Sequence, residues 1–338
     1  MTDNTLLSIN NLTTHYVTDE AIIHAVNRIN LELKTGESLG LVGESGAGKS
    51  TTAYSIMGIL PKLTGKIVQG EILFQGKDLT RTSEEQMRSI RGSQISMIFQ
   101  DPMTSLNPIL PVGDQIAEVL EIHGTGNRKE AMEKAGNMLE MVGIPKDRMH
   151  EYQHQFSGGM KQRVIIAIAL ACNPQLLIAD EPTTALDVTI QAQVLKMIKD
   201  LRMRLGTSLI LISHNLSVVA QLCENVAILY AGHIVEYGPL RDVFSNPFHP
   251  YTEGLLNCIP RIDVDKKRLS PIRGMMPDPS LVYEGCVFKP RCPYAEDICG
   301  LVTPGISEPA GRKVMCLMYQ DLMPNKMSID KAKGKIND

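Results

Sequence analysis

A glycine-rich octapeptide near the N-terminus limits the folds open to this chain of 338 residues. It reads GESGAGKS over residues 43–50 and matches the pattern G-x-x-x-x-G-K-[ST]. Glycines let such a loop curl so that successive backbone N–H groups point at phosphate oxygens, and the helix after it adds the positive end of its dipole. Lys49 supplies a charge for the β- and γ-phosphates, and the Ser50 hydroxyl is a ligand for Mg²⁺. The expected nucleotide-binding residues are Gly43, Glu44, Ser45, Gly46, Ala47, Gly48, Lys49, Ser50 and Thr51.

The segments around this octapeptide predict a strand before it and a helix after it. Ser38–Val42 is a short apolar run of the kind found in buried parallel strands, and a helix is expected over Lys49–Leu60, ended by Pro61. Closer to the N-terminus, Leu6–Val17 and Ala21–Leu33 are rich in β-branched residues and indicate strands. The order of strand, glycine loop and helix is typical of a mononucleotide-binding unit.

Strand and helix patterns alternate again in the second half of the chain. Residues 101–155 have the pattern of a mostly helical insertion, whereas periodicity fades after about residue 260. Repeated strand–helix units favour an α/β fold with a largely parallel sheet. The expected units are strands at Gln175–Ala179, Ser208–Ile212 and Val226–Tyr230, with helices at Ile190–Leu205 and from about Leu216.

Two adjacent carboxylates follow the apolar segment 176–179. Asp180, at the tip of this expected strand, suits the coordination shell of Mg²⁺. Glu181 comes one residue later and can polarise an attacking water as a general base. Two acids at a strand end are common on protein surfaces, but in a chain with a phosphate loop they indicate nucleotide hydrolysis.

A second glycine-containing segment, FSGGMKQ at residues 156–162, lies between these two motifs. It resembles the signature sequence of ATP-binding cassette (ABC) ATPases. Ser157, together with the backbone N–H groups of Gly158 and Gly159, can contact a phosphate at the start of an apolar helix. The family usually has Gln at the position of Met160, and this change removes one polar side chain while the Ser-Gly-Gly contact stays in place.

Four further residues match parts of the ABC cassette in their usual order. Gln100 matches the Q-loop glutamine, which contacts Mg²⁺ and the attacking water, and His214 matches the switch histidine at the γ-phosphate. Asp187 matches the D-loop, and Tyr16 occupies the place of the aromatic that stacks on adenine. The family sandwiches ATP between the phosphate loop of one protomer and the signature of another. The resemblance implies catalytic roles for Glu181, His214 and Gln100, and Mg²⁺ ligation by Ser50, Gln100 and Asp180.

The resemblance covers roughly residues 5–260 and implies a fold. This is the α/β fold of P-loop NTPases of the ABC type, in which a RecA-like core carries an N-terminal antiparallel β subdomain and a helical subdomain. We therefore expect a cassette over residues 1–260 with its helical subdomain at about 101–160. A small Cys-rich C-terminal extension is expected over residues 261–325, followed by a mobile tail over 326–338.

Charge and hydropathy narrow the kind of cassette protein. The formal net charge of −3 argues against nucleic-acid binding through bulk electrostatics. The longest apolar run, Val164–Cys172, has about half of the ~20 residues that a membrane span requires, and the N-terminus lacks a signal-peptide pattern. One cassette without membrane spans excludes a fused exporter, and no sustained heptads indicate a repair-type cassette. We expect a separate, peripheral ATPase subunit at the cytoplasmic face of the cell membrane.

Four segments resemble the ATPases of oligopeptide and dipeptide importers, and Met160 with Ile178–Asp180 is similar to the D-type member of their paired subunits. These segments are FQDPMTSLNP (99–108), SGGM (157–160), ADEPTTALDVT (179–189) and HPYT (249–252). The resemblance implies ATP hydrolysis that powers the uptake of di- and oligopeptides. Nickel or another small solute is the alternative cargo, and translation or repair is the alternative outside transport. The implied partners are a second, paralogous ATPase subunit, two transmembrane permeases and, indirectly, an extracytoplasmic peptide-binding protein.

The seven cysteines are unevenly spread, and four of them fall between residues 286 and 316. Four thiolates can hold a [4Fe–4S] cluster or one Zn²⁺ ion. Structural zinc sites usually bring their cysteines in pairs roughly two to four residues apart, and this segment has no such pair. The importer resemblance implies an iron–sulfur cluster on Cys286, Cys292, Cys299 and Cys316, while zinc and unliganded cysteines remain alternatives. The other three, Cys172, Cys223 and Cys258, are expected to be buried small apolar residues.

Overall fold

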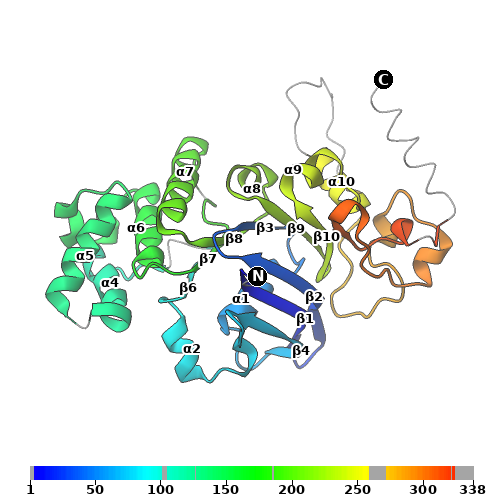
Figure 1. Cartoon of the computed structure of the whole chain (residues 1–338), viewed down its shortest axis with the longest axis horizontal. Helices are drawn as coiled ribbons and strands as arrows, with labels where there is room; N and C mark the ends of the chain where they lie inside the picture. The colour runs from blue at the N-terminus through cyan, green and yellow to red at the C-terminus, as the bar shows by residue number, and fades with distance from the viewer. Residues whose placement is uncertain are drawn as a thin grey trace.

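The structure is a computed structural model that describes residues 4–100, 105–125, 127–184, 186–258, 272–320 and 322–323. A seven-stranded sheet and a four-stranded sheet form its centre, with a group of helices on one side and the C-terminal segment on the other (Figure 1). The expected domain boundary near residue 260 and the expected tail at 326–338 lie outside the described residues.

The seven-stranded sheet has the order β11-β10-β9-β3-β8-β7-β6. Five of its strands are parallel and almost completely buried, which explains why their sequences are continuous apolar runs rather than alternating ones. These strands are Ser38–Val42 (β3), Ile95–Ile98 (β6), Leu176–Asp180 (β7), Ser208–Ser213 (β8) and Asn225–Tyr230 (β9). Their carboxyl ends share one edge of the sheet, where the loops that follow them meet.

The four-stranded sheet is antiparallel, with the order β2-β1-β4-β5. Its strands are Thr5–Val17 (β1), Ile22–Lys34 (β2), Gly65–Phe74 (β4) and Lys77–Asp78 (β5). It packs on α1 (Lys49–Met57) in a core that also holds side chains of β3. The helix α1 ends three residues earlier than expected because Gly58 takes up a left-handed backbone (φ 61°) and caps it.

Helices cover the parallel sheet, and a group of helices lies to one side of it (Figure 1). The expected helical insertion contains α4 (Val112–Leu120) and α5 (Arg128–Met141), which share a core with α6 (Gly158–Leu170). The remaining helices of this part of the chain are α2 (Glu84–Ile90), α7 (Val188–Leu205) and α8 (Leu216–Leu222). Among the helices that the structure describes, none combines the length and the apolar character that a membrane span requires.

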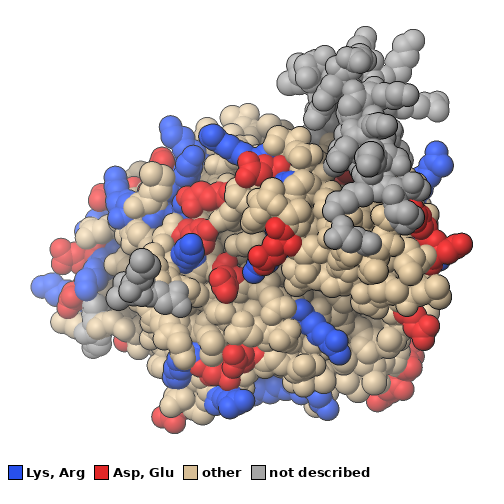
Figure 2. Space-filling view, turned by 45° about the vertical axis from the view of Figure 1, so that its right-hand side comes forward, with Lys and Arg blue, Asp and Glu red and all other residues tan. Residues whose placement is uncertain are grey.

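The C-terminal segment is built into the sheet. After β10 (His233–Pro239), α9 (Leu240–Ser245) and α10 (Pro250–Asn257), residues 272–320 form short 3₁₀ turns and one short strand, β11 (Lys313–Val314). This strand pairs antiparallel with β10, so that Val314 lies opposite Glu236. On the face shown in Figure 2, acidic and basic side chains are interspersed among uncharged ones, consistent with a net charge of −3.

Candidate functional site

The glycine-rich octapeptide forms the turn between β3 and α1. Gly46 (φ 81°) and Gly48 (φ 100°) adopt a left-handed backbone that disfavours side chains. A Cβ on Gly48 would lie 2.4 Å from the carbonyl oxygen of Ala25, and one on Gly43 would lie 2.2 Å from that of Leu229. The loop therefore lies tightly against β2 and β9. This close approach requires glycine at positions 43 and 48, whereas at Gly46 only the left-handed backbone favours glycine.

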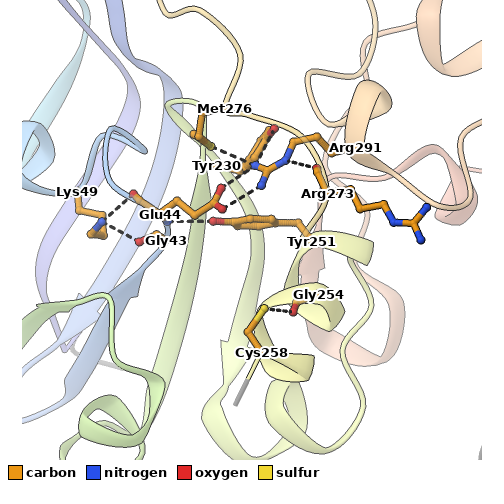
Figure 3. A network of polar contacts seen from close by, with 10 residues as sticks. All are labelled: Gly43, Glu44, Lys49, Tyr230, Tyr251, Gly254, Cys258, Arg273, Met276 and Arg291. Carbon is orange, nitrogen blue, oxygen red and sulfur yellow. Dashed lines mark hydrogen bonds and ion pairs between the residues drawn. The ribbon is translucent and has the colours of Figure 1, made fainter. Parts of the chain in front are cut away.

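Lys49 is buried beneath the loop, with 8% of its surface exposed. Its Nζ donates to the carbonyl oxygens of Gly43 (2.8 Å) and Glu44 (2.9 Å), as Figure 3 shows. Burial lowers the pKa of Lys49, and the carboxylates of Glu181, Asp180 and Glu44 oppose that change. The amine is thus held at the loop, close to the acids that end β7.

Asp180 ends β7 and is 1% exposed. Within the described part of the chain, neither of its carboxylate oxygens has a hydrogen-bond partner of ordinary geometry. Burial raises the pKa of Asp180, and the nearby Ser50 hydroxyl and Lys49 amine oppose the rise. Because an unpaired buried carboxylate is costly, Asp180 and Ser50 fit a site that takes up a cation such as Mg²⁺.

Glu181 follows Asp180 and is held by three side chains. Its Oε1 lies 2.8 Å from Nδ1 of His214, and its Oε2 accepts from the Thr184 hydroxyl (3.0 Å) and from Nε2 of Gln100 (3.3 Å). Burial raises the pKa of Glu181, but these hydrogen bonds overcome that effect and hold the pKa below its usual range. The carboxylate is therefore charged at neutral pH and able to accept a proton.

Gln100, Glu181 and His214 are distant in sequence and converge because adjacent parallel strands end at one edge. Gln100 follows β6, Glu181 follows β7 and His214 follows β8, and these strands are neighbours in the sheet. The backbone of Glu181 is left-handed (φ 48°), an unusual conformation for a residue with a side chain, and its N–H donates to the carbonyl oxygen of Ile212 (2.9 Å). The sheet edge thus assembles the three expected catalytic side chains.

Tyr16 reaches the loop from the antiparallel sheet. Its ring is half-buried near the end of β1, and its hydroxyl donates to Oγ1 of Thr51 at 3.2 Å. The aromatic expected at the adenine therefore lies next to the last residue of the expected phosphate site.

The expected signature and D-loop residues form a second group. Ser157 caps α6, where its Oγ accepts from the N–H of Met160 (3.4 Å). Asp187 caps α7, where its Oδ1 accepts from the N–H of Ile190 (2.9 Å). A Cβ on Gly159 would lie 2.6 Å from Ile190, so the two helix starts pack closely. No hydrogen bond or ion pair within the described residues joins this group to the phosphate loop. The chain thus presents two separate candidate half-sites.

The four C-terminal cysteines line one small cavity together with His249, Phe288 and Tyr294. Burial raises the pKa of Cys292 and of Cys316 to about 12, and in each case the charges of neighbouring cysteine thiolates add to the rise. The four cysteines, which are separated in the sequence, therefore line one cavity. No three His, Cys, Asp or Glu side chains of the described residues are arranged to hold a metal ion, so the structure shows no metal site there.

The expectation for the other three cysteines is only partly confirmed. Cys223 is buried, but Cys172 and Cys258 are half-buried. The thiols of these two point at backbone carbonyl oxygens, of Val119 (3.7 Å) and Gly254 (3.2 Å) respectively, which satisfies a weak donor that an apolar site would leave unpaired.

Sequence reasoning missed two residues that hold the loop from the C-terminal side. The Tyr251 hydroxyl accepts from the N–H of Glu44 (2.9 Å), and Arg291 pairs with the carboxylate of Glu44 (2.6 Å). Tyr251 belongs to the HPYT segment, which carries the resemblance to importer ATPases but no local sign of this contact. Arg291 had no local signal beyond its place before Cys292.

Comparison with known proteins supplies the family. The sequence matches the family model for ABC transporters over residues 26–184 and the model for the oligopeptide/dipeptide transporter C-terminal region over residues 235–299. It is 51% identical over 306 residues to the probable peptide ABC transporter ATP-binding protein y4tR of Sinorhizobium fredii, covering 90% of this chain and 91% of that protein. It is 49% identical over 321 residues to the oligopeptide transport ATP-binding protein AppD of Bacillus subtilis, covering 94% and 98%.

Solved structures agree on the fold. A dimeric ATP-binding cassette in a post-hydrolysis state with ADP and phosphate superposes with a TM-score of 0.62 at 29% identity, covering 70% of this chain and 99% of that one. The protein cbiO1 of Clostridium perfringens, part of an ABC transporter complex, superposes with a TM-score of 0.63 at 28% identity, covering 72% and 92%. The expected ABC-type cassette fold is confirmed.

Proposed function

Because the chain belongs to the family of oligopeptide/dipeptide ABC transporter ATP-binding proteins, we propose that it is the ATP-hydrolysing subunit of an importer for di- and oligopeptides. One observation carries the hydrolytic part of the proposal. Glu181 is a charged carboxylate oriented by His214, Thr184 and Gln100 beside the buried Lys49 and Asp180. This is the arrangement that a general base for water needs next to a phosphate site.

In the proposed reaction, the phosphates of ATP lie on residues 43–51 and the adenine lies against Tyr16. Lys49 and the loop N–H groups neutralise the terminal phosphates. Glu181 accepts a proton from water as the water oxygen bonds to the γ-phosphorus and the bond to the leaving ADP oxygen breaks. Mg²⁺, when held by Ser50, Asp180 and Gln100, supplies positive charge to the phosphate oxygens. His214 keeps the Glu181 carboxylate in place at 2.8 Å.

The signature group completes the site of a second subunit. Ser157 and the N–H groups of Gly158 and Gly159 stand at the start of α6, where a helix attracts phosphate. Because no hydrogen bond or ion pair among the described residues joins them to this chain's own loop, we propose that they close over ATP bound to a partner ATPase. A single subunit then has two incomplete sites and hydrolyses ATP slowly. The partner is a paralogous subunit, as the paired importer ATPases imply.

Hydrolysis is coupled to movement of the membrane partners. We place the contact with two transmembrane permeases at residues 100–108, of which 101–104 lie outside the described residues. In this arrangement Gln100 links the permease contact to Glu181, to which it donates at 3.3 Å. The subunit then works as a peripheral protein at the cytoplasmic face of the membrane, and an extracytoplasmic peptide-binding protein delivers cargo to the permeases. We propose no nucleic-acid partner.

The C-terminal cysteines are proposed as ligands of a [4Fe–4S] cluster. The donor set fits, since Cys286, Cys292, Cys299 and Cys316 surround one cavity. Zn²⁺ is the alternative, because structural zinc sites usually bring their cysteines in pairs about two to four residues apart and this segment has no such pair. These residues lie in the proposed Cys-rich region at 261–325, which follows the proposed cassette at 1–260.

Iron analysis tests this assignment. We expect an anaerobic preparation of the full chain to be brown, with an absorbance band near ~400 nm and iron bound in proportion to protein. The variant Cys299→Ser should lose the band, whereas the variant Cys172→Ser should keep it, because Cys172 lies outside the cavity. A colourless wild-type protein with stoichiometric zinc would overturn the cluster.

The transport function is tested in proteoliposomes that contain the complete importer with both ATPase subunits, both permeases and the binding protein. We expect ATP-dependent uptake of a labelled tripeptide, which Glu181→Gln abolishes and the exposed control Glu130→Gln retains. Uptake of Ni²⁺ without uptake of peptide selects the alternative cargo. Stable association of the purified chain with ribosomes or DNA, and not with permeases, contradicts a role in transport.

A further inference from the structure

An ion pair between Arg291 and Glu44 joins the C-terminal segment to the phosphate loop. Arg291 is 4% exposed at its side chain, and it holds Glu44, the second residue of the loop, with both guanidinium ends. Its Nη1 donates to Oε2 of Glu44 at 2.6 Å and its Nη2 donates to Oε1 at 3.0 Å. This two-point geometry is the strongest form of carboxylate recognition in proteins and fixes the direction of the Glu44 side chain.

The guanidinium of Arg291 is held in place independently of Glu44. Its Nε donates to the carbonyl oxygen of Arg273 (3.0 Å), and it lies 5.6 Å from the ring centre of Tyr230. The sulfur of Met276 and the Tyr230 hydroxyl are both 3.5 Å from Nη1. Figure 3 shows these groups around the guanidinium, while the side chain of Arg273 itself points away. The cation is therefore ready in position for Glu44.

Every polar group of Glu44 has a partner in this arrangement. The N–H donates to the Tyr251 hydroxyl (2.9 Å), the carbonyl oxygen accepts from Lys49 (2.9 Å), and the carboxylate is paired with Arg291. The side chain extends from the loop toward Arg291, on the opposite side from Lys49 (Figure 3). Two of the three partners belong to residues beyond β10, outside the part of the chain that carries the phosphate motif.

The charge of Glu44 has a consequence for an anion-binding loop. The carboxylate is 31% exposed and is carried by the loop whose backbone is expected to receive phosphate. A negative charge at this place repels the phosphates of ATP, and at partly buried positions such repulsion is weakly screened. A paired cation removes most of that repulsion without occupying the phosphate position.

We propose that Arg291 is a positioning residue of the nucleotide site, which neutralises Glu44 and holds its carboxylate away from bound phosphate. Through this pair the C-terminal segment sets the affinity of the loop for ATP. The inference rests on the proposed ATP site at residues 43–51. It assigns to Arg291 a role through Glu44 and no contact with the nucleotide.

The test is a double-mutant cycle on the purified full chain, with ATP and Mg²⁺ as the probe and calorimetry as the readout. We expect Arg291→Met to raise the Kd for ATP by about tenfold, because Glu44 is left unpaired. Glu44→Gln should lower the Kd severalfold, since Arg291 then adds a positive charge. The double variant Glu44→Gln/Arg291→Met should return to within about twofold of wild type. Arg291→Lys keeps the charge, loses the two-point geometry and should fall between wild type and Arg291→Met.

Steady-state kinetics separate positioning from general damage. Arg291→Met should raise KM for ATP with little change in kcat. Arg273→Met is the matched control, because the exposed side chain of Arg273 lies outside the network, and it should behave as wild type. Equal impairment of Arg291→Met and the double variant would mean that Arg291 is only a structural anchor and would overturn the inference. Failure of the wild-type chain to bind ATP would instead overturn the proposed function.

Discussion

Glu181 illustrates how neighbouring side chains set the properties of a single acid. Its backbone is left-handed (φ 48°), and a strained conformation of this kind persists only when the surrounding structure enforces it. The N–H of Glu181 is held by the carbonyl oxygen of Ile212 (2.9 Å), and the hydrogen bonds from His214, Thr184 and Gln100 orient the carboxylate and select its charged form. At the residue scale, the charge and orientation of the proposed base therefore depend on three hydrogen bonds as well as on its being a glutamate.

The acid side of the pH–rate profile depends on these bonds. Because they hold the pKa of Glu181 below its usual range, the carboxylate stays charged, and hydrolysis continues, until the pH falls through that lowered pKa. Thr184→Val removes the 3.0 Å bond and should raise the pKa, so that activity is lost at a higher pH on the acid side. The measurement is kcat/KM for ATP against pH in the assembled importer. An unchanged acid limb would show that Thr184 does not tune the base.

At the scale of elements, the strand β11 connects the C-terminal segment to the cassette. Arg312 lies just before β11. Its Cζ is 3.3 Å from the ring centre of Phe248, and its Nη2 donates to the carbonyl oxygen of Asn246 (2.9 Å). Its Nη1 lies 3.7 Å from Oε1 of Glu236 in β10, which is completely buried and accepts from two backbone N–H groups. The pairing of β10 with β11 thus buries two opposite charges at the sheet edge.

Removal of one of these charges should loosen the edge. We expect Arg312→Met to lower the free energy of unfolding by on the order of 3 kcal/mol, because the buried Glu236 loses the positive charge beside it. The control Arg241→Met changes an exposed arginine on the neighbouring helix α9 and should have little effect. Chemical denaturation of the full chain measures both. Equal midpoints and slopes for the two variants would rule out a stabilising role for Arg312.

At the scale of the whole molecule, the two candidate half-sites lie on separate groups of elements. The phosphate loop, Asp180 and Glu181 belong to the sheet, whereas Ser157 and Asp187 stand at the starts of α6 and α7. The C-terminal segment lies on the other side of the sheet and contacts the phosphate loop through Arg291. Hydrolysis in the proposed mechanism therefore requires two ATPase subunits, and the C-terminal segment influences it from outside that interface.

Loss of the proposed base Glu181 should trap an ATP-bound dimer. The variant Glu181→Gln should bind ATP, because the loop and Lys49 are intact, but should not activate water. We therefore expect it to accumulate as an ATP-bound dimer with the second ATPase subunit, or with itself if a copy serves as partner. Light scattering coupled to gel filtration, with and without ATP and Mg²⁺, measures the mass. Full ATPase activity of this variant would contradict the role of Glu181 as the base.

Much of the fold could be predicted because most strands of the two sheets have recognisable apolar or β-branched sequences. Six strands lie within one or two residues of their expected positions: β1, β2, β3, β7, β8 and β9. Strands β4, β5, β6, β10 and β11 were not predicted. Of these, β5, β6 and β11 have only two or four residues, and β4 contains Gly65 and Gly70, which weaken a strand pattern. The start of α1 followed from the phosphate motif, but its end depended on the conformation of Gly58.

The sequence by itself determined the chemistry of the site. Three features of the site are local sequence patterns that can be recognised without knowledge of the fold: the phosphate loop, the Asp180–Glu181 pair and the cysteine spacing. Only the tertiary structure brought Gln100, Thr184 and His214 onto Glu181, and only it placed Arg291 on Glu44. The physical reason is that these contacts depend on the order of strands in the sheet and on the path of the C-terminal segment. Neither leaves a periodic signal in a single sequence.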